Sequence, residues 1–219
     1  MPIRIPTPEN ICAEFFMRNE SPAADSFPHI EPSQVHGKNI IVINESNISE
    51  YARPFRPEAD GIFLTVPDVA ASLRFADCTP VIIWDSSWAV ILHSGYKGTV
   101  LNICAEGLRI AREIFADVSG ACAWIGPCIG REYFRKINDE WTSRGITSFH
   151  RGNFSADGDN VYFSLADEIM SQLIDGGLRR ENIFLSGINT LTDSRCYSYR
   201  NGDIHERMTL TAKIKGSTD

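Results

Sequence analysis

The stretch RFADCTPVIIWDSSWAVILHSGYKGT, residues 74–99, decides the fold of this chain. Two apolar runs flank a short polar segment around Ser86, which has the length of a hairpin turn. Each run is apolar on both faces, as is typical of central strands that are covered on two sides. The sequence therefore predicts an antiparallel pair of buried strands over 80–84 and 88–92.

The same hairpin carries a thiol and an imidazole at matching ends of its strands. With a turn centred on Ser86, Cys78 is expected opposite Ser94, and His93 opposite Thr79. Cross-strand neighbours on one face have Cβ atoms about 5 Å apart, and diagonal neighbours about 7–8 Å. We therefore expect the two side chains to converge on one atom.

Other segments extend this hairpin into an α+β domain. Short turns between several of the strands favour a mixed or antiparallel sheet over a doubly wound one. Compact apolar runs predict strands over 39–44, 61–66 and 182–188, the last taken as the final strand, and a strand running into a Gly-Pro loop over 121–130. Apolar residues at helical spacing predict helices over 100–117, with Thr99 as N-cap, and over 161–177.

The length and composition fit one soluble unit of 219 residues. The net charge of −7 and the lack of a Lys and Arg cluster argue against a general nucleic-acid binder. No run approaches the roughly 18 apolar residues of a membrane span, and no secretory signal begins the sequence. We expect a cytoplasmic protein whose six cysteines are thiols, with an irregular segment over 1–33 that holds a short strand at 12–17.

Several features around the hairpin indicate a binding site. Glycines flank Lys97 on both sides and allow a ligand to approach the backbone, and a helix starting near Thr99 would present free N–H groups to an anion. His36, in the segment SQVHGK, adds a third donor to Cys78 and His93. Catalytic zinc typically takes three N, S or O protein ligands and keeps a fourth position open. Residues 189–207, polar but rich in aromatics and arginines, are expected to line the site.

Five ordered motifs, QVHG, ADCTPV, ILHSGYKGT, WIGPCIG and CYSYRNGDIHER, resemble those of the YfiH-like family. The family is also described as multicopper polyphenol oxidases or laccase-domain proteins, and as purine nucleoside phosphorylases. The resemblance extends over about residues 34–208. It implies a single-domain layered α/β/β/α sandwich over 1–219, related to the catalytic domain of cytotoxic necrotizing factor.

The resemblance also implies a chemistry. It implies a zinc ion held by His36, Cys78 and His93, and a purine nucleoside and phosphate as substrates. The family's activities are phosphorolysis of adenosine, inosine and methylthioadenosine, and deamination of adenosine. For deamination a carboxylate should move the proton, and Asp77 is the nearest in sequence.

Four positions depart from the family pattern, the first being Tyr96 where the family usually has a tryptophan. Lys97 stands where the family usually has an arginine, and lysine keeps the charge but loses the two-pronged grip on phosphate. The family's late double arginine is here Arg200 followed by Asn201, and Glu206 replaces the usual glycine. We expect Lys97 and Arg200 to hold the phosphate or the nucleoside. The sequence predicts no particular oligomeric state.

Three alternatives remain open at this point. In a metal-free cysteine hydrolase, Cys78 would be the nucleophile and His93 its base, which leaves His36 unexplained. In a copper oxidase, copper would load opportunistically because its affinity for N and S ligands exceeds that of zinc, but five histidines are few for multicopper chemistry. In a nucleoside-binding protein without catalysis, the motif changes would mark a decayed site.

Overall fold

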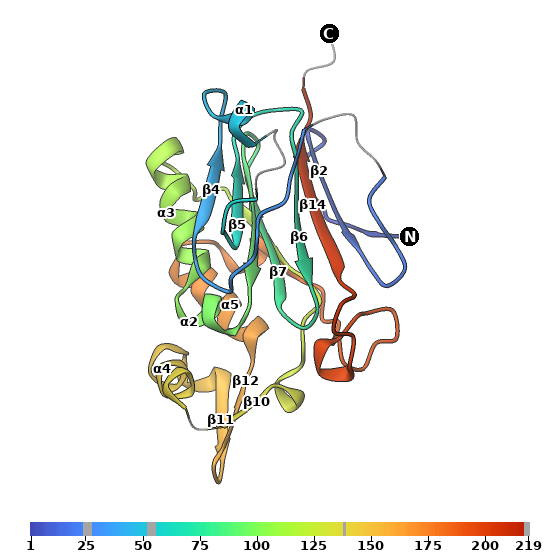
Figure 1. Cartoon of the computed structure of the whole chain (residues 1–219). Helices are drawn as coiled ribbons and strands as arrows, with labels where there is room; N and C mark the ends of the chain where they lie inside the picture. The colour runs from blue at the N-terminus through green and yellow to red at the C-terminus, as the bar shows by residue number, and fades with distance from the viewer. Residues whose placement is uncertain (24–27, 52–55, 138, 217–219) are drawn as a thin grey trace.

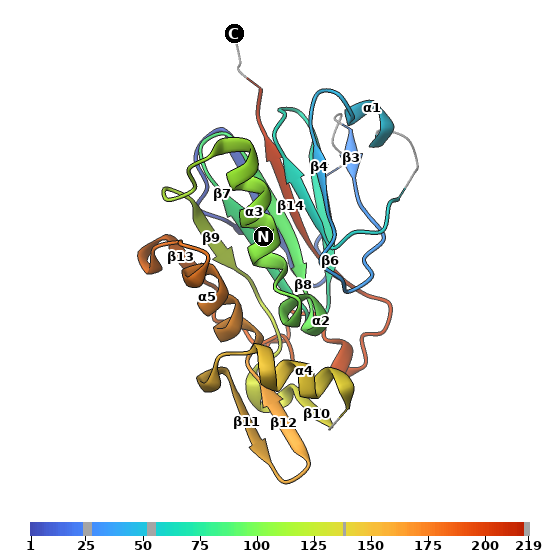
Figure 2. The same cartoon turned by 90° about the vertical axis from the view of Figure 1, so that its left-hand side faces the viewer.

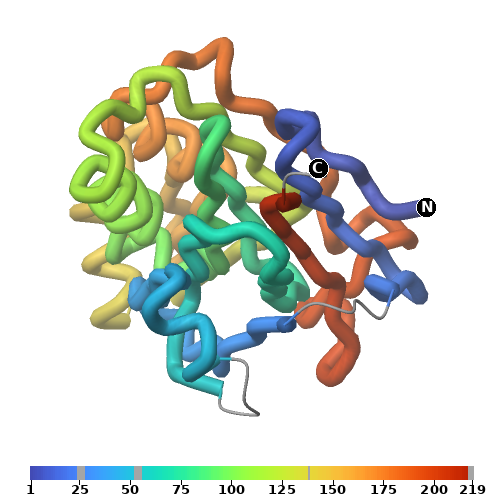
Figure 3. The backbone as a smooth tube through the Cα atoms, turned by 90° about the horizontal axis from the view of Figure 1, so that it is seen from above, coloured from blue at the N-terminus to red at the C-terminus, as the bar shows by residue number. Residues whose placement is uncertain are grey.

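Two β-sheets pack face to face, and two helices cover the outer face of the larger sheet (Figure 1). The structure is a computed structural model, and it describes residues 1–23, 28–51, 56–137 and 139–216. Viewed from above, helix α3 (Ile103–Phe115) and the N-terminal strands lie on opposite sides, with the C-terminal strand between them (Figure 3). The predicted α+β architecture with mixed sheets is confirmed.

The larger sheet has six strands in the order β13-β9-β7-β8-β5-β4. These strands are β4 (Ile40–Ile43), β5 (Gly61–Leu64), β7 (Thr79–Trp84), β8 (Ala89–Ser94), β9 (Cys122–Ile125) and β13 (Ile183–Leu185). Every residue of β7 and β8 is buried, which confirms the predicted central hairpin. One side of this sheet faces the helices and the other faces the second sheet.

The register of the hairpin differs by one residue from the prediction. Thr79 lies opposite Ser94, and Pro80 lies opposite His93. The turn is centred between residues 86 and 87, because Asp85 donates its N–H to the carbonyl of Trp88 at 3.1 Å and closes a two-residue loop. A one-residue slip moves each side chain to a different partner across the hairpin, so the predicted cross-strand pairs were wrong.

The second sheet has five strands in the order β1-β2-β14-β6-β3. These strands are β1 (Ile3–Arg4), β2 (Ile11–Phe16), β3 (His29–Ile30), β6 (Ala70–Phe75) and β14 (Met208–Ile214). Alternate residues of β14 are buried against the larger sheet, as expected for a strand with one face in the core. The short strand predicted at 12–17 is confirmed as β2, but the segment over 1–33 is not simply irregular, because it supplies three strands.

Two further corrections concern the ends of elements. β14 follows β13, so β13 is not the final strand. The helix predicted over 100–117 is two helices, α2 (Tyr96–Val100) and α3, and Asn102 rather than Thr99 caps α3 by accepting the N–H of Ala105 at 2.9 Å. Thr99 instead donates its hydroxyl to the carbonyl of Gly95 at 2.9 Å. The helix N-terminus expected to face an anion is therefore absent at Thr99.

The helix predicted over 161–177 begins later than expected. Residues 160–163 form strand β12 (Asn160–Phe163), and α5 (Leu165–Asp175) starts after the side chain of Ser164, which caps it. The apolar residues of the strand run directly into those of the helix, and Ser164 marks the boundary between the two elements. Helices α3 and α5 lie side by side on the six-stranded sheet (Figure 2).

A small third layer at one end of the molecule was not predicted. It contains β10 (Arg135–Ile137), β11 (Phe154–Asp157), β12 and α4 (Glu140–Ser148). Buried aromatic rings of Tyr96, Phe149 and Phe163 join it to α2. The remaining elements are α1 (Ile48–Tyr51) and the 3-10 turns Arg131–Tyr133, Arg151–Asn153, Arg180–Asn182 and Tyr199–Asn201.

The proline-marked link predicted over 52–60 falls partly outside the described residues, at 52–55. In the part of the chain that the structure describes, no helix combines the length and the hydropathy that a membrane span needs.

Candidate metal centre

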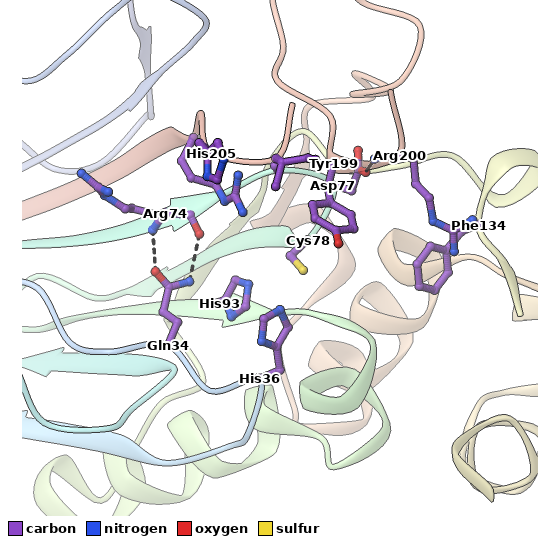
Figure 4. A pocket seen from close by; sticks show the side chains of 13 residues that line it. Gln34, His36, Arg74, Asp77, Cys78, His93, Phe134, Tyr199, Arg200 and His205 are labelled. Carbon is purple, nitrogen blue, oxygen red and sulfur yellow. Dashed lines mark hydrogen bonds between the residues drawn. The ribbon is translucent and has the colours of Figure 1, made fainter. Parts of the chain in front are cut away.

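Two imidazoles and a thiol come together at one end of the central hairpin. Cys78 immediately precedes β7, His93 is the fifth residue of β8, and His36 lies in the loop before β4. One donor atom from each lies within 4.8 Å of the other two. Figure 4 shows the three side chains converging on one side of the pocket. The predicted convergence of Cys78, His93 and His36 is therefore present.

A buried carboxylate holds two of the three donors in place. Asp60 is fully buried and accepts the Nδ1–H of His93 at 2.7 Å. It also accepts the backbone N–H groups of Val35, His36 and Gly37 at 3.2, 3.0 and 2.6 Å. With Nδ1 engaged, the Nε2 atom of His93 is left for a ligand, which is the usual second-sphere arrangement of a metal-bound histidine.

The space beside the three donors requires a glycine. A Cβ atom at Gly95 would lie 2.9 Å from Sγ of Cys78 and 3.1 Å from Cδ2 of His36. Gly95 has ordinary extended dihedral angles, with φ at −72°, so it is the lack of a side chain that matters here. Any larger residue would have to displace the candidate ligands.

Two residues at the centre have left-handed backbone conformations that cost free energy in non-glycine residues. His36 has a φ of 60° and Asp77 a φ of 75°. Such residues cluster at functional sites, where the surrounding contacts hold them. Asp60 holds the backbone of His36, and hydrogen bonds to the carboxylate of Asp77 hold that residue.

The proximity of thiol and imidazole shifts both pKa values in the protein without a bound ion. Burial raises the pKa of the Cys78 thiol, but His93 and His36 outweigh burial and lower it to about 6. Burial lowers the pKa of His93, but the Cys78 thiolate and the Asp60 carboxylate outweigh burial and raise it to about 9. The thiolate is therefore available for a metal or an electrophile near neutral pH.

The three donors form one wall of a pocket of about 710 Å³, a volume within the ordinary range for small-molecule sites. Segments 34–36, 74–78 and 199–207, together with Phe134, supply the rest of the lining. The loop predicted over 189–207 thus contributes to the site as expected. The lining contains three arginines and one carboxylate, which favours an anionic ligand although the chain as a whole is acidic.

The predicted site residues occupy different places around this pocket. Asp77 lines it, but both carboxylate oxygens accept hydrogen bonds, from the Thr190 hydroxyl at 2.6 Å and the Arg200 N–H at 2.8 Å. Arg200 lines it with its guanidinium over the Phe134 ring. Lys97 lies outside it, over the ring of Trp141, in a neighbouring cavity that shares His36 with the pocket.

Sequence reasoning missed Asp60 and Tyr199. Asp60 directly precedes β5, and nothing local distinguishes it from a strand-end aspartate. Tyr199 lies in the loop that was expected to line the site, and the run of aromatics and arginines in that loop was the available signal. Gln34 and Arg74 were missed in the same way: the amide of Gln34 bonds to the backbone of Arg74 at the far end of the pocket (Figure 4).

The donor set fits a transition metal ion. Two imidazoles and one thiolate are ligands that zinc and copper both accept. Three protein ligands leave a coordination position open toward the pocket, as catalytic sites require. Among the described residues, this is the one group of three such side chains close enough to share an ion.

Comparisons with known proteins agree with the fold and the motifs. A family described as multi-copper polyphenol oxidoreductase laccase matches residues 16–213. A purine nucleoside phosphorylase of Aquifex aeolicus is 24% identical over 72% of this chain and 71% of its own length. Purine nucleoside phosphorylase YlmD of Bacillus subtilis is 27% identical over 76% of this chain and 63% of its own length, which is less than two thirds.

A solved structure shows the same architecture. The hypothetical protein YfiH of Bacillus licheniformis superposes with a TM-score of 0.82 and 20% identity, covering 94% of this chain and 93% of that one. The family match spans most of the chain and includes all three candidate ligands. The chain therefore belongs to the laccase-domain family that includes the YfiH and YlmD proteins.

Proposed function

We propose that this protein is a zinc-dependent purine nucleoside phosphorylase. The observation that carries the proposal is the His36, Cys78 and His93 group, which opens into a cationic pocket of suitable size. The names of the Aquifex aeolicus and Bacillus subtilis relatives support the substrate class. In the reaction, the bond from C1′ of the ribose to the purine nitrogen breaks and a bond from C1′ to a phosphate oxygen forms.

The residues of the pocket have different roles in this proposal. A zinc ion held by the three donors would supply Lewis-acid stabilisation of developing negative charge. Asp60 orients His93 and anchors the backbone that carries His36. Arg200 lines the pocket and supports phosphate binding there better than Lys97, whose side chain borders the neighbouring cavity.

Asp77 has a positioning role in this scheme. Its two oxygens accept hydrogen bonds from Thr190 and from the backbone of Arg200, so its carboxylate fixes the loop beside Cys78. A proton-transfer role for Asp77 in adenosine deamination stays a prediction. Deamination needs no phosphate, so inosine formed from adenosine in phosphate-free buffer would be its signature.

The free thiols of all six cysteines support a reducing, cytoplasmic setting.

The test is a product assay on zinc-loaded, metal-stripped and His36→Ala protein. We expect adenosine or inosine to give free base and ribose 1-phosphate, and methylthioadenosine to give adenine and methylthioribose 1-phosphate, only when zinc and phosphate are both present. His36→Ala should lose zinc and activity together. Full turnover by the metal-stripped protein would contradict the proposal.

One observation favours a second candidate, a metal-free cysteine hydrolase. Cys78, His93 and Asp60 have the order of a nucleophile, base and orienting carboxylate. This candidate requires activity that survives chelation and the loss of His36. The same His36→Ala assay therefore separates the two functions.

The copper and binding-only alternatives have weaker support. Of the other three histidines, His29 contacts Ser72 and His150 contacts Glu168 and Asp175, and neither belongs to the group of three donors. His205 lines the pocket outside the group of three donors. Oxidation of a phenolic substrate by copper-loaded protein, or tight nucleoside binding without turnover, would favour these alternatives.

A further inference from the structure

Tyr199 is an exposed aromatic side chain held on a fixed backbone at the mouth of the pocket. Its exposed fraction is 58%, although it lies in a loop whose neighbouring residue Ser198 is almost fully buried. Figure 4 shows its ring projecting from the loop toward Cys78. Exposed apolar surface at a concave site is a common sign of a ligand contact.

Hydrogen bonds on both sides fix the position of the loop. The N–H of Ser198 donates to Asp203 at 2.9 Å, and the N–H of Arg200 donates to Asp77 at 2.8 Å. The N–H of Asn201 donates to the carbonyl of Ser198 at 3.0 Å and closes the 3-10 turn. The loop backbone is therefore already ordered, so binding a ligand on the tyrosine ring would cost little conformational entropy of the protein.

A second anchor comes from the start of the chain. Arg18 donates to Asp203 at 2.8 Å and to the carbonyl of Cys196 at 2.8 Å, and it stacks on the ring of Tyr197 at 4.4 Å. The loop is thus held between β2 and the pocket. These contacts fix the backbone of Tyr199 but do not cover its ring.

The ends of the pocket differ in chemistry. Tyr199 and Phe134 supply aromatic rings at one end, and Arg200 covers the Phe134 ring at 5.4 Å. The other end is polar, with Gln34, Arg74 and His205 in its lining (Figure 4). A ligand with a flat heteroaromatic part and a polar part would match this polarity only in one orientation.

We propose that the ring of Tyr199 is the stacking surface for the purine base. This inference rests on the proposed function for the identity of the ligand, and it adds a base-binding subsite on the loop 199–207. Base stacking on an aromatic side chain is sequence-tolerant, because every purine offers a similar π face.

The experiment compares Tyr199→Ala, Tyr199→Phe and the control Tyr133→Ala in the zinc-loaded full chain. Tyr133 is also partly exposed, at 39%, but does not line the pocket. Adenosine binding is measured by calorimetry without phosphate, and the KM values for adenosine and phosphate are measured separately. Zinc content and melting temperature confirm that each variant is folded and loaded.

We expect Tyr199→Ala to weaken adenosine binding roughly 5- to 150-fold, the effect of losing one base-stacking contact. Tyr199→Phe and Tyr133→Ala should bind within about twofold of the parent, and the KM for phosphate should stay unchanged in all three. Equal losses in the Phe and Ala variants would overturn the proposal in favour of a role for the hydroxyl. Normal adenosine binding by Tyr199→Ala would also overturn it.

The outcomes distinguish this inference from the proposed function. If the parent binds adenosine through Tyr199 but releases no base with phosphate, the subsite stands and phosphorolysis fails. If the parent cleaves adenosine and Tyr199→Ala does so with an unchanged KM, phosphorolysis stands and the subsite fails. If the parent neither binds nor cleaves adenosine, both are wrong.

Discussion

The Nδ1 atom of His93 lies 2.7 Å from Oδ1 of Asp60, and both side chains are buried. Burial raises the pKa of the Asp60 carboxyl, but hydrogen bonds from His93 and the backbone outweigh it, so the pKa lies below its usual value. The carboxylate is therefore ionised in the folded protein and fixes which imidazole nitrogen faces the pocket. Because Asp60 also accepts the backbone N–H groups of residues 35–37, its carboxylate links strand β8 to the loop that carries His36.

Asp60→Asn should weaken zinc binding about 10- to 100-fold, the usual cost of losing a second-sphere partner of a metal ligand. The amide keeps the shape of the side chain but not its charge. Competition with a chromophoric chelator measures the affinity, and Asp157→Asn on the exposed strand β11 is the matched control. Unchanged zinc affinity in Asp60→Asn would show that the carboxylate does not support the metal.

Gly95→Ala should damage the centre without unfolding the protein. The added methyl group would lie 2.9 Å from the Cys78 sulfur, so a ligand has to move, and a displacement of about 1 Å can cost about 100-fold in kcat/KM. Gly152→Ala, where a Cβ meets no atom within 4 Å, is the control. Activity and zinc content are measured in both, and parent-like values in Gly95→Ala would refute the tight packing inferred at this position.

Arg200→Gln and Lys97→Gln together locate the phosphate. If Arg200 binds phosphate in the pocket, its loss should raise the KM for phosphate about 10- to 150-fold, the range for a hydrogen bond to a charged group. Lys97→Gln should change this KM by less than about threefold, since Lys97 borders the neighbouring cavity. The reverse order of effects would instead support the lysine as the phosphate ligand.

In the metal-free protein, Cys78 should be the thiol that iodoacetamide modifies fastest at pH 7. Its pKa is lowered to about 6, whereas burial raises the pKa values of Cys104, Cys128 and Cys196 to about 12, 11 and 12. The rate should rise as the pH increases through about 6 and then level off. Peptide mass spectrometry identifies the site. Zinc should protect it, and equal labelling with and without zinc would argue against Cys78 as a ligand.

His150 should stabilise the fold mainly at acidic pH. Burial lowers its pKa, but contacts with Glu168 and Asp175 outweigh burial and raise the pKa above the ordinary value of 6.5. A raised pKa in the folded state gives stability that is fully present below about pH 6.5 and is lost as the pH rises through the folded pKa. Melting temperatures of His150→Gln should therefore fall below those of the parent at pH 5.5, and the difference should shrink by pH 9.

The control for that series is His205→Gln, at an exposed histidine in the pocket loop. A destabilisation by His150→Gln that is the same at every pH would mean that packing, rather than the charge of the imidazole, holds the segment 149–153 against α5.

The hairpin and its donors were predictable because their signals are local. Two apolar runs joined by a short turn require buried paired strands, and the histidine and cysteine lie at the ends of those runs. The register was harder to predict, since it depends on the hydrogen bond by which Asp85 and Trp88 close the turn. Sequence periodicity does not contain that hydrogen bond.

The second sheet and Asp60 depend on contacts between distant segments. β14 alternates buried and half-buried residues, but it forms a strand by pairing with β2 and β6, which lie far away in the sequence. Asp60 is ordinary by itself and becomes important only when folding brings it to His93 and to the loop at 35–37. The layer around α4 was missed because its core is formed by aromatic residues from α2, β12 and the segment before the 3-10 turn Arg151–Asn153.

The central place of β14 in the five-stranded sheet has a consequence for biosynthesis. While the ribosome is still making residues 208–214, β2 and β6 have no partner between them, and an incomplete sheet edge can pair with other nascent chains. Residues 199–207, which line the pocket and bond to Asp77 and Arg18, are made just before β14. All three candidate metal ligands precede residue 94, so the metal centre is synthesised well before the strand that completes the second sheet.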